Sequence, residues 1–320
     1  MNNQTTVIAI DHGNRNIKTN NYIFPASYIE SGHLPSMGND KLTYMGKEYT
    51  LADKRMSQKN DKTKDESYFI LTLFAIGKEL ASEMKACFKE EHIEIELLAG
   101  LPPLHCKEMG ARYKEYYKNS GEKIYFEFNE IPFSIRIKDV HIYPQAYSAT
   151  VTIHNEISKY KFMNIVDIGG YTVDLLHLTD FEPDMTLCTS LYSGVNLLFQ
   201  KINEMSRSKG MNDIPDNIIE GILLNDTATV SETSEGRIEL VRESATRFTS
   251  ELLAQITQAG MDLEEKPTIF IGGGSILLKP YIQKSSVVSK PLFIDNIRAN
   301  VEGYQLLYRV KPDRAMAHVQ

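Results

Sequence analysis

The sequence predicts an α/β protein of two similar domains that share one nucleotide pocket. Three segments carry this prediction, since each joins a buried-type strand to a turn that contains glycine: Val7–Lys18, Asn164–Asp174 and Ile269–Ser275. In the first two, an apolar strand ends in an aspartate, Asp11 or Asp167. The glycine turn that follows can bring backbone N–H groups against an anion. The repetition of this pattern in both halves of the chain is more informative than either copy.

Length and composition fit a globular protein with two hydrophobic cores. The chain has 320 residues, of which 42% are hydrophobic and 24% are charged, values that are ordinary for about two soluble domains. The formal net charge of −7 argues against a surface that neutralises nucleic-acid phosphates. Acidic residues dilute the densest run of lysines, residues 47–64, and we expect a solvated segment there. Direct nucleic-acid binding is therefore not expected.

The cysteines and the apolar runs predict a cytoplasmic protein. Cys87, Cys106 and Cys188 lie far apart and follow no disulfide or metal-ligand spacing, which fits a reducing compartment. The longest apolar run, residues 68–77, is about half of a membrane span, so neither export nor membrane insertion is expected. The eight histidines are scattered and predict no metal site.

Hydrophobic periodicity predicts the order of strands and helices. In the first half we expect strands over residues 7–10, 17–24 (the hairpin partner of the first), 42–45, 93–99, 123–128 and 133–142. A polar excursion from the core sheet is expected over residues 25–64, and helices over 67–84, 104–118 and from 144 onward.

After His154 the pattern of strand and glycine turn starts again. We expect strands within 164–178, at 185–191, near 268 and at 291–295, and helices after Ser193-Gly194, over most of 199–261 with a loop at 231–237, within 268–282, and over 299–310. These elements predict one domain of residues 1–150, to which residues 297–320 return, and a second domain of residues 151–296.

The three glycine segments and Gln145 together have the groups that MgATP requires. Phosphoryl transfer needs donors for the phosphate oxygens, a carboxylate near the metal and a group that orients the attacking water. We expect Asp11 and Asp167 to hold Mg²⁺ through its waters, and Gln145 to orient the lytic water. The other expected nucleotide contacts are backbone N–H groups of Gly13, Asn14, Gly169 and Gly170, the Lys18 ammonium, the Thr172 hydroxyl, the adenosine-facing Gly272, Gly273 and Gly274, and Ser275 as the cap of the next helix.

Each of these features has a plainer explanation when it is taken alone. An Asp-x-Gly sequence after a strand is usually an ordinary turn, and Gly-Gly-Gly-Ser is usually a flexible joint. Gln145 alone is a polar residue after a proline. Their joint occurrence in this order favours the nucleotide pocket.

The order and spacing of these segments resemble the superfamily of actins, sugar kinases and heat-shock chaperone ATPases over almost the whole chain. Within it, the run Asp11–Lys18 resembles the D-x-G-x-x-N-x-K motif of the ParM/StbA plasmid-segregation actins, and Gly100-Leu101-Pro102 and Pro144-Gln145 are also similar to that family. The resemblance implies two ribonuclease-H-like domains, each a mixed sheet flanked by helices, with the nucleotide in the cleft between them. It also implies ATP-dependent filaments that push plasmid copies apart.

The same resemblance implies roles for individual residues. Asp11 and Asp167 match the metal-side carboxylates, Asn16 and Lys18 match nucleotide contacts, and Gln145 matches the water-orienting position. His12 departs from the family pattern, which usually has a small or acidic residue there, and we expect it beside the phosphates. ATP is the expected nucleotide, with GTP as the alternative, and residues 193–221 on the adenine side stay unassigned.

Three functions are known for this fold, and the fold alone does not choose among them. A small-molecule kinase would need a catalytic base aimed at a substrate hydroxyl, and a chaperone would need a substrate-binding domain after the ATPase. The sequence favours a filament-forming ATPase that segregates plasmid DNA, with a chromosomal or phage cytoskeletal homologue or a sugar- or acetate-type kinase as alternatives. The expected partners are further copies of the chain and a DNA-binding adaptor, without a membrane anchor.

Overall fold

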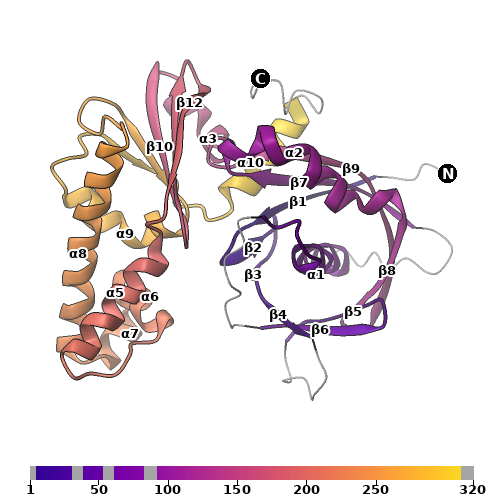
Figure 1. Ribbon diagram of the computed structural model, residues 1–320, viewed down its shortest axis with the longest axis horizontal. Helices are drawn as coiled ribbons and strands as arrows, with labels where there is room; N and C mark the ends of the chain where they lie inside the picture. The colour runs from indigo at the N-terminus through magenta and orange to yellow at the C-terminus, as the bar shows by residue number, and fades with distance from the viewer. Residues whose placement is uncertain (1–4, 31–38, 53–60, 83–91, 311–320) are drawn as a thin grey trace. The chain divides into compact units, whose positions relative to one another are not determined.

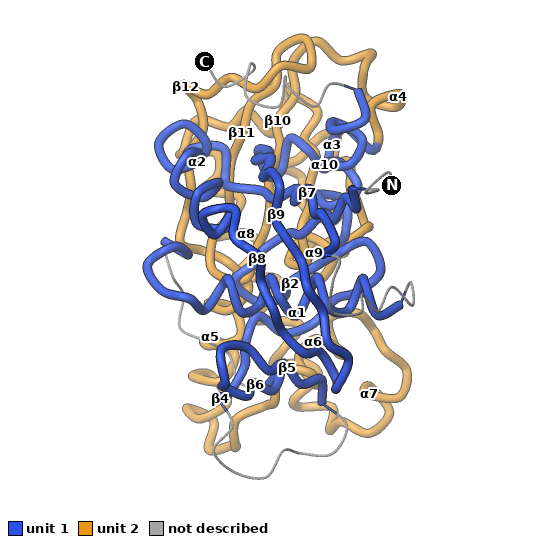
Figure 2. Tube along the Cα trace, turned by 90° about the vertical axis from the view of Figure 1, so that its right-hand side faces the viewer, with its two compact units in different colours: residues 1–152, 298–320 blue, residues 153–297 orange. Residues whose placement is uncertain are grey.

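The computed structural model describes residues 5–30, 39–52, 61–82 and 92–310. The chain divides into two compact units (Figure 2). Unit 1 comprises residues 1–152 and 298–320, and unit 2 comprises residues 153–297. The breaks expected from the sequence fall after residues 150 and 296.

Unit 1 is built on a nine-stranded mixed sheet in the order β3-β2-β1-β7-β9-β8-β5-β6-β4. Its strands are β1 (Thr6–His12), β2 (Asn16–Lys18), β3 (Ile23–Pro25), β4 (Tyr28–Glu30), β5 (Lys41–Tyr44), β6 (Lys47–Leu51), β7 (Ile93–Leu101), β8 (Lys123–Phe128) and β9 (Ile131–Pro144). The neighbours β1, β7 and β9 run parallel. Their carboxyl ends therefore meet at one edge of the sheet, where Asp11 and Gln145 lie.

Helix α1 (Ser67–Ser82) forms the centre of the unit 1 core, and the sheet curls around it (Figure 1). Twelve of its 16 residues are buried, which explains why residues 68–77 are apolar on every side instead of along one stripe. Gly77 admits β8 closely, since a Cβ there would lie 2.7 Å from the Phe128 ring. Because the sheet encloses α1, the helix has apolar residues on all of its sides and no polar face.

The remaining helices of unit 1 lie on both sides of this sheet. They are α2 (Pro103–Lys118), which contacts β9 and β7, the short α3 (Tyr147–Val151), and α10 (Ala299–Val310), which contacts β1, β7 and α3; a 3-10 turn spans Asn119–Gly121. Helix α2 is on the side of α1, where its Tyr116 hydroxyl accepts from the Phe69 N–H over 2.8 Å, and α10 packs on Ala9 and Leu98 of the opposite face. Gly303 allows α10 to meet α3, because a Cβ on it would lie 1.8 Å from the carbonyl oxygen of Ser148. The C-terminal helix is thereby fixed directly behind the end of β9.

Unit 2 has a five-stranded sheet in the order β12-β11-β10-β13-β14. The strands are β10 (Phe162–Ile168), β11 (Val173–Thr179), β12 (Glu182–Leu191), β13 (Thr268–Ile271) and β14 (Pro291–Phe293), and the helices are α4 (His154–Ile157), α5 (Val195–Ser208), α6 (Asp216–Leu223), α7 (Thr227–Glu232), α8 (Glu235–Gln258) and α9 (Gly273–Lys284). The apolar faces of α5, α6, α8 and α9 share one core cluster with β10, β11 and β13. Because β10 and β13 are parallel, Asp167 and Gly272 lie at the same edge. None of the described helices has the length and apolar content that a membrane span requires.

Three element predictions are wrong in detail. Residues 17–24 form two strands, β2 and β3, because Thr19 and Tyr22 bond to each other across a tight turn. The segment expected as an excursion, 25–64, belongs to the same sheet, since β5 pairs with β8. The loop expected at 231–237 is reduced to residues 233–234 between α7 and α8. Met84, Cys87, part of the lysine-rich run (53–60) and the chain end (311–320) lie outside the described residues.

The contact between α10 and α3 gives a stability prediction. We expect Gly303→Ala to lower the free energy of unfolding by about 1–3 kcal/mol, because the methyl group collides with a backbone carbonyl that cannot rotate away. The matched control is Gly236→Ala in α8, where no atom lies within 4 Å of the added Cβ and alanine favours the helix by up to about 1 kcal/mol. Urea denaturation measures both, and equal effects of the two variants would contradict this packing.

Candidate functional site

Asp11, at the end of β1, is the centre of the first group of candidate residues. Gln145 Nε2 donates to Asp11 Oδ1 over 2.7 Å, and Lys18 Nζ lies 3.2 Å from Asp11 Oδ2. Asp11 and Lys18 are direct cross-strand partners of β1 and β2, so their side chains share one face of the sheet. Unit 1 thus brings together three of the predicted residues, although Gln145 is 134 positions from Asp11.

The Asp11 side chain is buried and ionised. Burial acts to raise the pKa of this carboxyl, but the ammonium groups of Lys18 and Lys62 outweigh it, and the pKa lies below its ordinary value. Lys62 Nζ also donates to the carbonyl oxygen of His12. A carboxylate held in this form can accept hydrogen bonds from metal-bound water while it fixes the Gln145 amide.

His12 is a core residue, and its ring is not directed to the surface. It is 1% exposed, stacks on Tyr117 of α2 at 4.7 Å and shares a 2.8 Å hydrogen bond with Thr72 of α1. Thr72 donates its hydroxyl proton to the Tyr68 carbonyl, so it accepts from His12, whose Nε2 carries the proton. Burial, together with Lys62, lowers the His12 pKa to about 3. The ring is therefore neutral and packs between α1 and α2, while its expected place beside the phosphates stays a prediction.

The turn after Asp11 is fixed by its own contacts. A Cβ on Gly13 would lie 2.5 Å from the carbonyl oxygen of Asn16, so the turn requires glycine. The Gly13 N–H donates to the Asp11 carbonyl over 3.0 Å, and the Asn14 side-chain oxygen accepts from Tyr68 of α1. The Gly13 N–H is thus engaged inside the turn, whereas the sequence predicts that it faces an anion.

Gln145 is the first residue of a strained three-residue turn. Ala146 has φ 65° and ψ −61°, and the Tyr147 N–H donates to the Gln145 carbonyl over 2.7 Å. These values define the rarer, strained kind of γ-turn, which persists only where the surroundings hold it. The Ala146 N–H donates to Asn300 Oδ1 of α10 over 3.0 Å, and the Gln145 N–H donates to the Leu101 carbonyl over 2.8 Å.

The side chain of Gln145 also depends on Gly100 of β7. A Cβ at Gly100 would lie 1.8 Å from the Tyr304 hydroxyl and 2.9 Å from Gln145 Cγ. Because Gly100 has no side chain, the Tyr304 side chain of α10 and the Gln145 side chain both fit beside β7. The sequence singles out Gly100-Leu101-Pro102 as a motif. It does not reveal that α10 is the helix that packs against Gly100.

In unit 2, the turn between β10 and β11 is a candidate anion site. The carbonyl oxygens of Gly169, Gly170 and Tyr171 accept from the N–H groups of Val195, Asn196 and Gly194, over 2.9–3.1 Å. These three carbonyls face the N-terminus of α5. Because the N–H and C=O of a trans peptide point in opposite directions, the N–H groups of Gly170, Tyr171 and Thr172 lie on the side of the turn away from α5. Successive amides on one side form a nest of the kind that binds phosphate.

Two carboxylates flank this turn. Asp167 and Asp174 are direct cross-strand partners of β10 and β11, so they share a face, and like charges placed in this way destabilise a sheet. Ser190 Oγ donates to Asp174 Oδ1, and Thr172 Oγ1 lies 3.5 Å from Asp174 Oδ2. Sequence analysis missed Asp174. Strand alternation could have found it, since it lies as far after the turn as Asp167 lies before it.

Asp167 also lies against the start of α9. Its Oδ1 is 2.3 Å from the position of a Cβ on Gly272, whose φ is 87°, so both space and backbone conformation require glycine. Gly274 sits close to β10, since its Cβ would lie 2.4 Å from Ile168 Cγ2, while no atom lies within 4 Å of a Cβ on Gly273. The prediction that Ser275 caps α9 is wrong, because Gly272 is the N-cap and Ser275 Oγ donates back to its carbonyl.

The oxygen ligands of both units suit a hydrated cation. Within the described residues, no group of three or more His, Cys, Asp or Glu side chains could enclose a metal ion. Asp11 in unit 1 and the pair Asp167 and Asp174 in unit 2 are hard oxygen donors. They fit an ion such as Mg²⁺, which is bound through one or two carboxylates and keeps several waters.

Two family models match the sequence, one in each half of the chain. Residues 9–147 match the N-terminal domain of actin-like proteins, and residues 165–284 match the C-terminal domain of the archaeal actin homologue related to MreB. No curated protein sequence matched the chain.

Known structures resemble the chain over nearly its whole length. The archaeal actin homologue Ta0583 has a TM-score of 0.72 at 16% identity, with 96% of this chain and 100% of that chain covered. A 15-stranded ParM filament from Clostridium botulinum has a TM-score of 0.71 at 18% identity, with 96% and 99% covered. ParM from Bacillus thuringiensis with AMPPNP has a TM-score of 0.68 at 12% identity, with 96% and 99% covered.

These structural matches establish the fold. The family models show that the sequences of both halves are also similar to those of actin-like proteins. The match over residues 9–147 contains Asp11, Lys18 and Gln145, and the match over residues 165–284 contains Asp167 and the two glycine segments of unit 2. By its matches over residues 9–147 and 165–284, the chain belongs to the actin-like proteins, with the fold that ParM and archaeal actin homologues share.

Proposed function

We propose that this protein is an ATPase whose ATP-bound form polymerises into filaments. The observation that carries the proposal is the turn Gly169–Thr172, where α5 holds three carbonyls and leaves three amides on the opposite side. A row of N–H donors beside two carboxylates suits a phosphate chain with its metal ion. Support also comes from known structures of similar fold, which include Bacillus thuringiensis ParM with ATP and a ParM filament.

In this proposal each unit contributes different groups to the nucleotide. The amides of Gly170, Tyr171 and Thr172 bind phosphate oxygens, and Lys18 adds a positive charge. Asp11, Asp167 and Asp174 hold Mg²⁺ through its waters. The ion, when bound, neutralises charge on the phosphate oxygens.

Gln145 has the role of orienting the attacking water. Its Nε2 donates to Asp11, so the amide plane is fixed and Oε1 is the atom that accepts from a water. Orientation of water and stabilisation of charge account for most of the catalysis in phosphoryl transfer. Gly273, where a Cβ would meet no atom within 4 Å, gives the adenosine access to the backbone, and ATP is proposed over GTP because of the ATP-bound relative.

We further propose that the filaments segregate plasmid DNA through a DNA-binding adaptor. Head-to-tail contacts that do not close generate open filaments, and hydrolysis would weaken those contacts. The net charge of −7 favours an adaptor over direct contact with DNA phosphates. A chromosomal or phage filament system and a kinase of the same superfamily are the alternatives.

Sedimentation with nucleotide tests the proposed function. We expect the purified protein to pellet on ultracentrifugation and to scatter light with MgATP, and to return to the supernatant as phosphate is released. EDTA should abolish both the pellet and phosphate release, because the carboxylates then hold no ion. A protein that stays soluble with MgATP and instead phosphorylates acetate or a sugar would be a kinase.

Gln145→Ala separates hydrolysis from binding. We expect phosphate release to fall by about 10²-fold, within the range for loss of a group that acts on the attacking water, while ATP affinity changes by less than about threefold. Filaments of this variant should persist longer. The control is Gln258→Ala at the exposed end of α8, and parent-like hydrolysis in Gln145→Ala would remove the proposed role.

Asn300 is a positioning residue in this proposal, because its Oδ1 holds the Ala146 N–H. We expect Asn300→Ala to lower kcat for ATP hydrolysis by about tenfold with KM nearly unchanged. Asn300→Asp keeps an oxygen acceptor and should restore most of the rate. If both variants lose stability and activity in parallel, Asn300 acts only in packing.

A further inference from the structure

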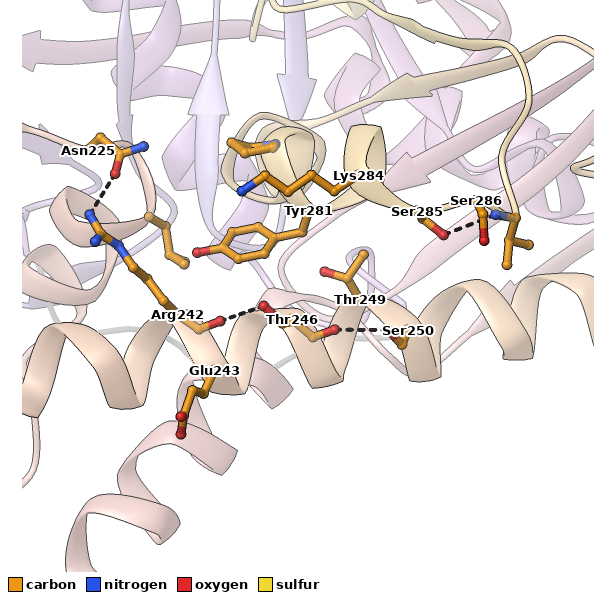
Figure 3. Close-up of a pocket in the computed structure, with 13 residues that line it drawn as sticks. Asn225, Arg242, Glu243, Thr246, Thr249, Ser250, Tyr281, Lys284, Ser285 and Ser286 are labelled. Atoms are coloured by element: carbon orange, nitrogen blue, oxygen red, sulfur yellow. Dashed lines mark hydrogen bonds between the residues drawn. The ribbon is translucent and has the colours of Figure 1, made fainter.

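A separate pocket lies in unit 2 between α8, the second half of α9 and the loop that follows α9 (Figure 3). Its volume is about 780 Å³. It shares no lining residue with the Gly169–Thr172 turn or with the Gly272–Ser275 start of α9. The proposed ATPase function therefore leaves this pocket without a role.

Thr249 is an unusual residue in this pocket. It is 2% exposed, and within the described part of the chain its Oγ1 has no hydrogen-bond partner. Its neighbours on α8 differ, since Thr246 and Ser250 both donate to carbonyls one turn earlier. A buried hydroxyl without a partner lowers the stability of a fold. The Oγ1 atom is also closed off from solvent, so Thr249 belongs to the wall of the pocket and is not a contact for a ligand.

Two cations and a phenol border the same space. In Figure 3 the Arg242 guanidinium, the Lys284 ammonium and the Tyr281 hydroxyl point toward the same side of the pocket. Arg242 Nη2 donates to Asn225 Oδ1 over 2.9 Å, which orients the guanidinium. Glu243 also lines the pocket, but its carboxylate lies on the opposite side of α8 from Tyr281 (Figure 3). The three groups that point to this side of the pocket are all hydrogen-bond donors.

Part of the pocket wall is apolar. Leu223, Pro280, Val287 and the Tyr281 ring line it beside the polar groups. A phosphate offers only acceptors and carries the charge that an arginine and a lysine attract. An apolar wall beside such a cluster accommodates a planar or hydrocarbon body.

We propose that this pocket binds a small organic phosphate. Its phosphate group lies between Arg242 and Lys284 and accepts from the Tyr281 hydroxyl, and its apolar body lies against Pro280 and the Tyr281 ring. The pocket shares no lining residue with the proposed nucleotide site, so this proposal does not rest on the proposed ATPase function.

Titration of the full chain with phenyl phosphate tests this assignment by calorimetry. We expect saturable binding that Arg242→Gln and Lys284→Gln each weaken at least tenfold, while Arg247→Gln, an exposed α8 arginine outside the pocket, leaves it unchanged. Benzoate and inorganic phosphate should each bind at least fivefold more weakly. Equal binding of benzoate, or insensitivity to both pocket variants, would overturn the proposal.

Tyr281→Phe gives a second test. Phenylalanine keeps the ring that lies against the apolar body of the ligand and removes only the hydroxyl, so phenyl phosphate should bind at least threefold more weakly. The affinity for benzoate should stay the same. Unchanged affinity for phenyl phosphate would mean that the hydroxyl does not face the phosphate and would contradict the proposal.

Discussion

The three hydrogen bonds from the N-terminus of α5 to the turn between β10 and β11 are the constraint on which unit 2 depends. The first N–H groups of a helix have no partner within it, and here the carbonyls of Gly169, Gly170 and Tyr171 supply partners. The peptide planes are thereby fixed with their amides on the other side. Gly194 is required for this approach, since a Cβ there would lie 2.5 Å from the Gly170 carbonyl. The positive end of the α5 dipole lies behind the turn and adds to its attraction for anions.

The two halves look alike in sequence but offer different chemistry. In unit 2 the turn presents amides, because a helix N-terminus engages its carbonyls. In unit 1 the Gly13 N–H is bonded within its own turn, and the ionised Asp11 forms a cluster of side chains with Lys18 and Gln145 instead. Duplication of a strand and glycine turn thus predicted similar roles for the two turns in one pocket. The surroundings of each turn instead make one a set of backbone donors and the other a charged cluster.

Local patterns in the sequence predicted most elements, and non-local contacts account for the failures. The terminal helix follows its periodicity over Ala299–Val310, and the strands that carry Asp11 and Asp167 end where expected. No local signal, in contrast, reveals that β5 pairs with β8, because neighbours across a sheet leave no pattern in either strand. The γ-turn at Ala146 was equally hidden, since alanine with positive φ has no sequence signature, and its partner Asn300 is 154 positions away.

The strain at Ala146 links the packing of α10 to the orientation of Gln145. Backbone angles of this kind cost about 1–3 kcal/mol, and the two hydrogen bonds that hold the turn, to Asn300 and Leu101, contribute about 1 kcal/mol each. These amounts nearly balance, so the orientation of Gln145 depends on the bond that α10 supplies through Asn300. Hydrogen exchange at the Ala146 amide measures this balance, and we infer that it proceeds by local opening, faster than exchange in the β9 core. Exchange as slow as that of β9 would mean that the turn is held far more firmly than its two bonds allow.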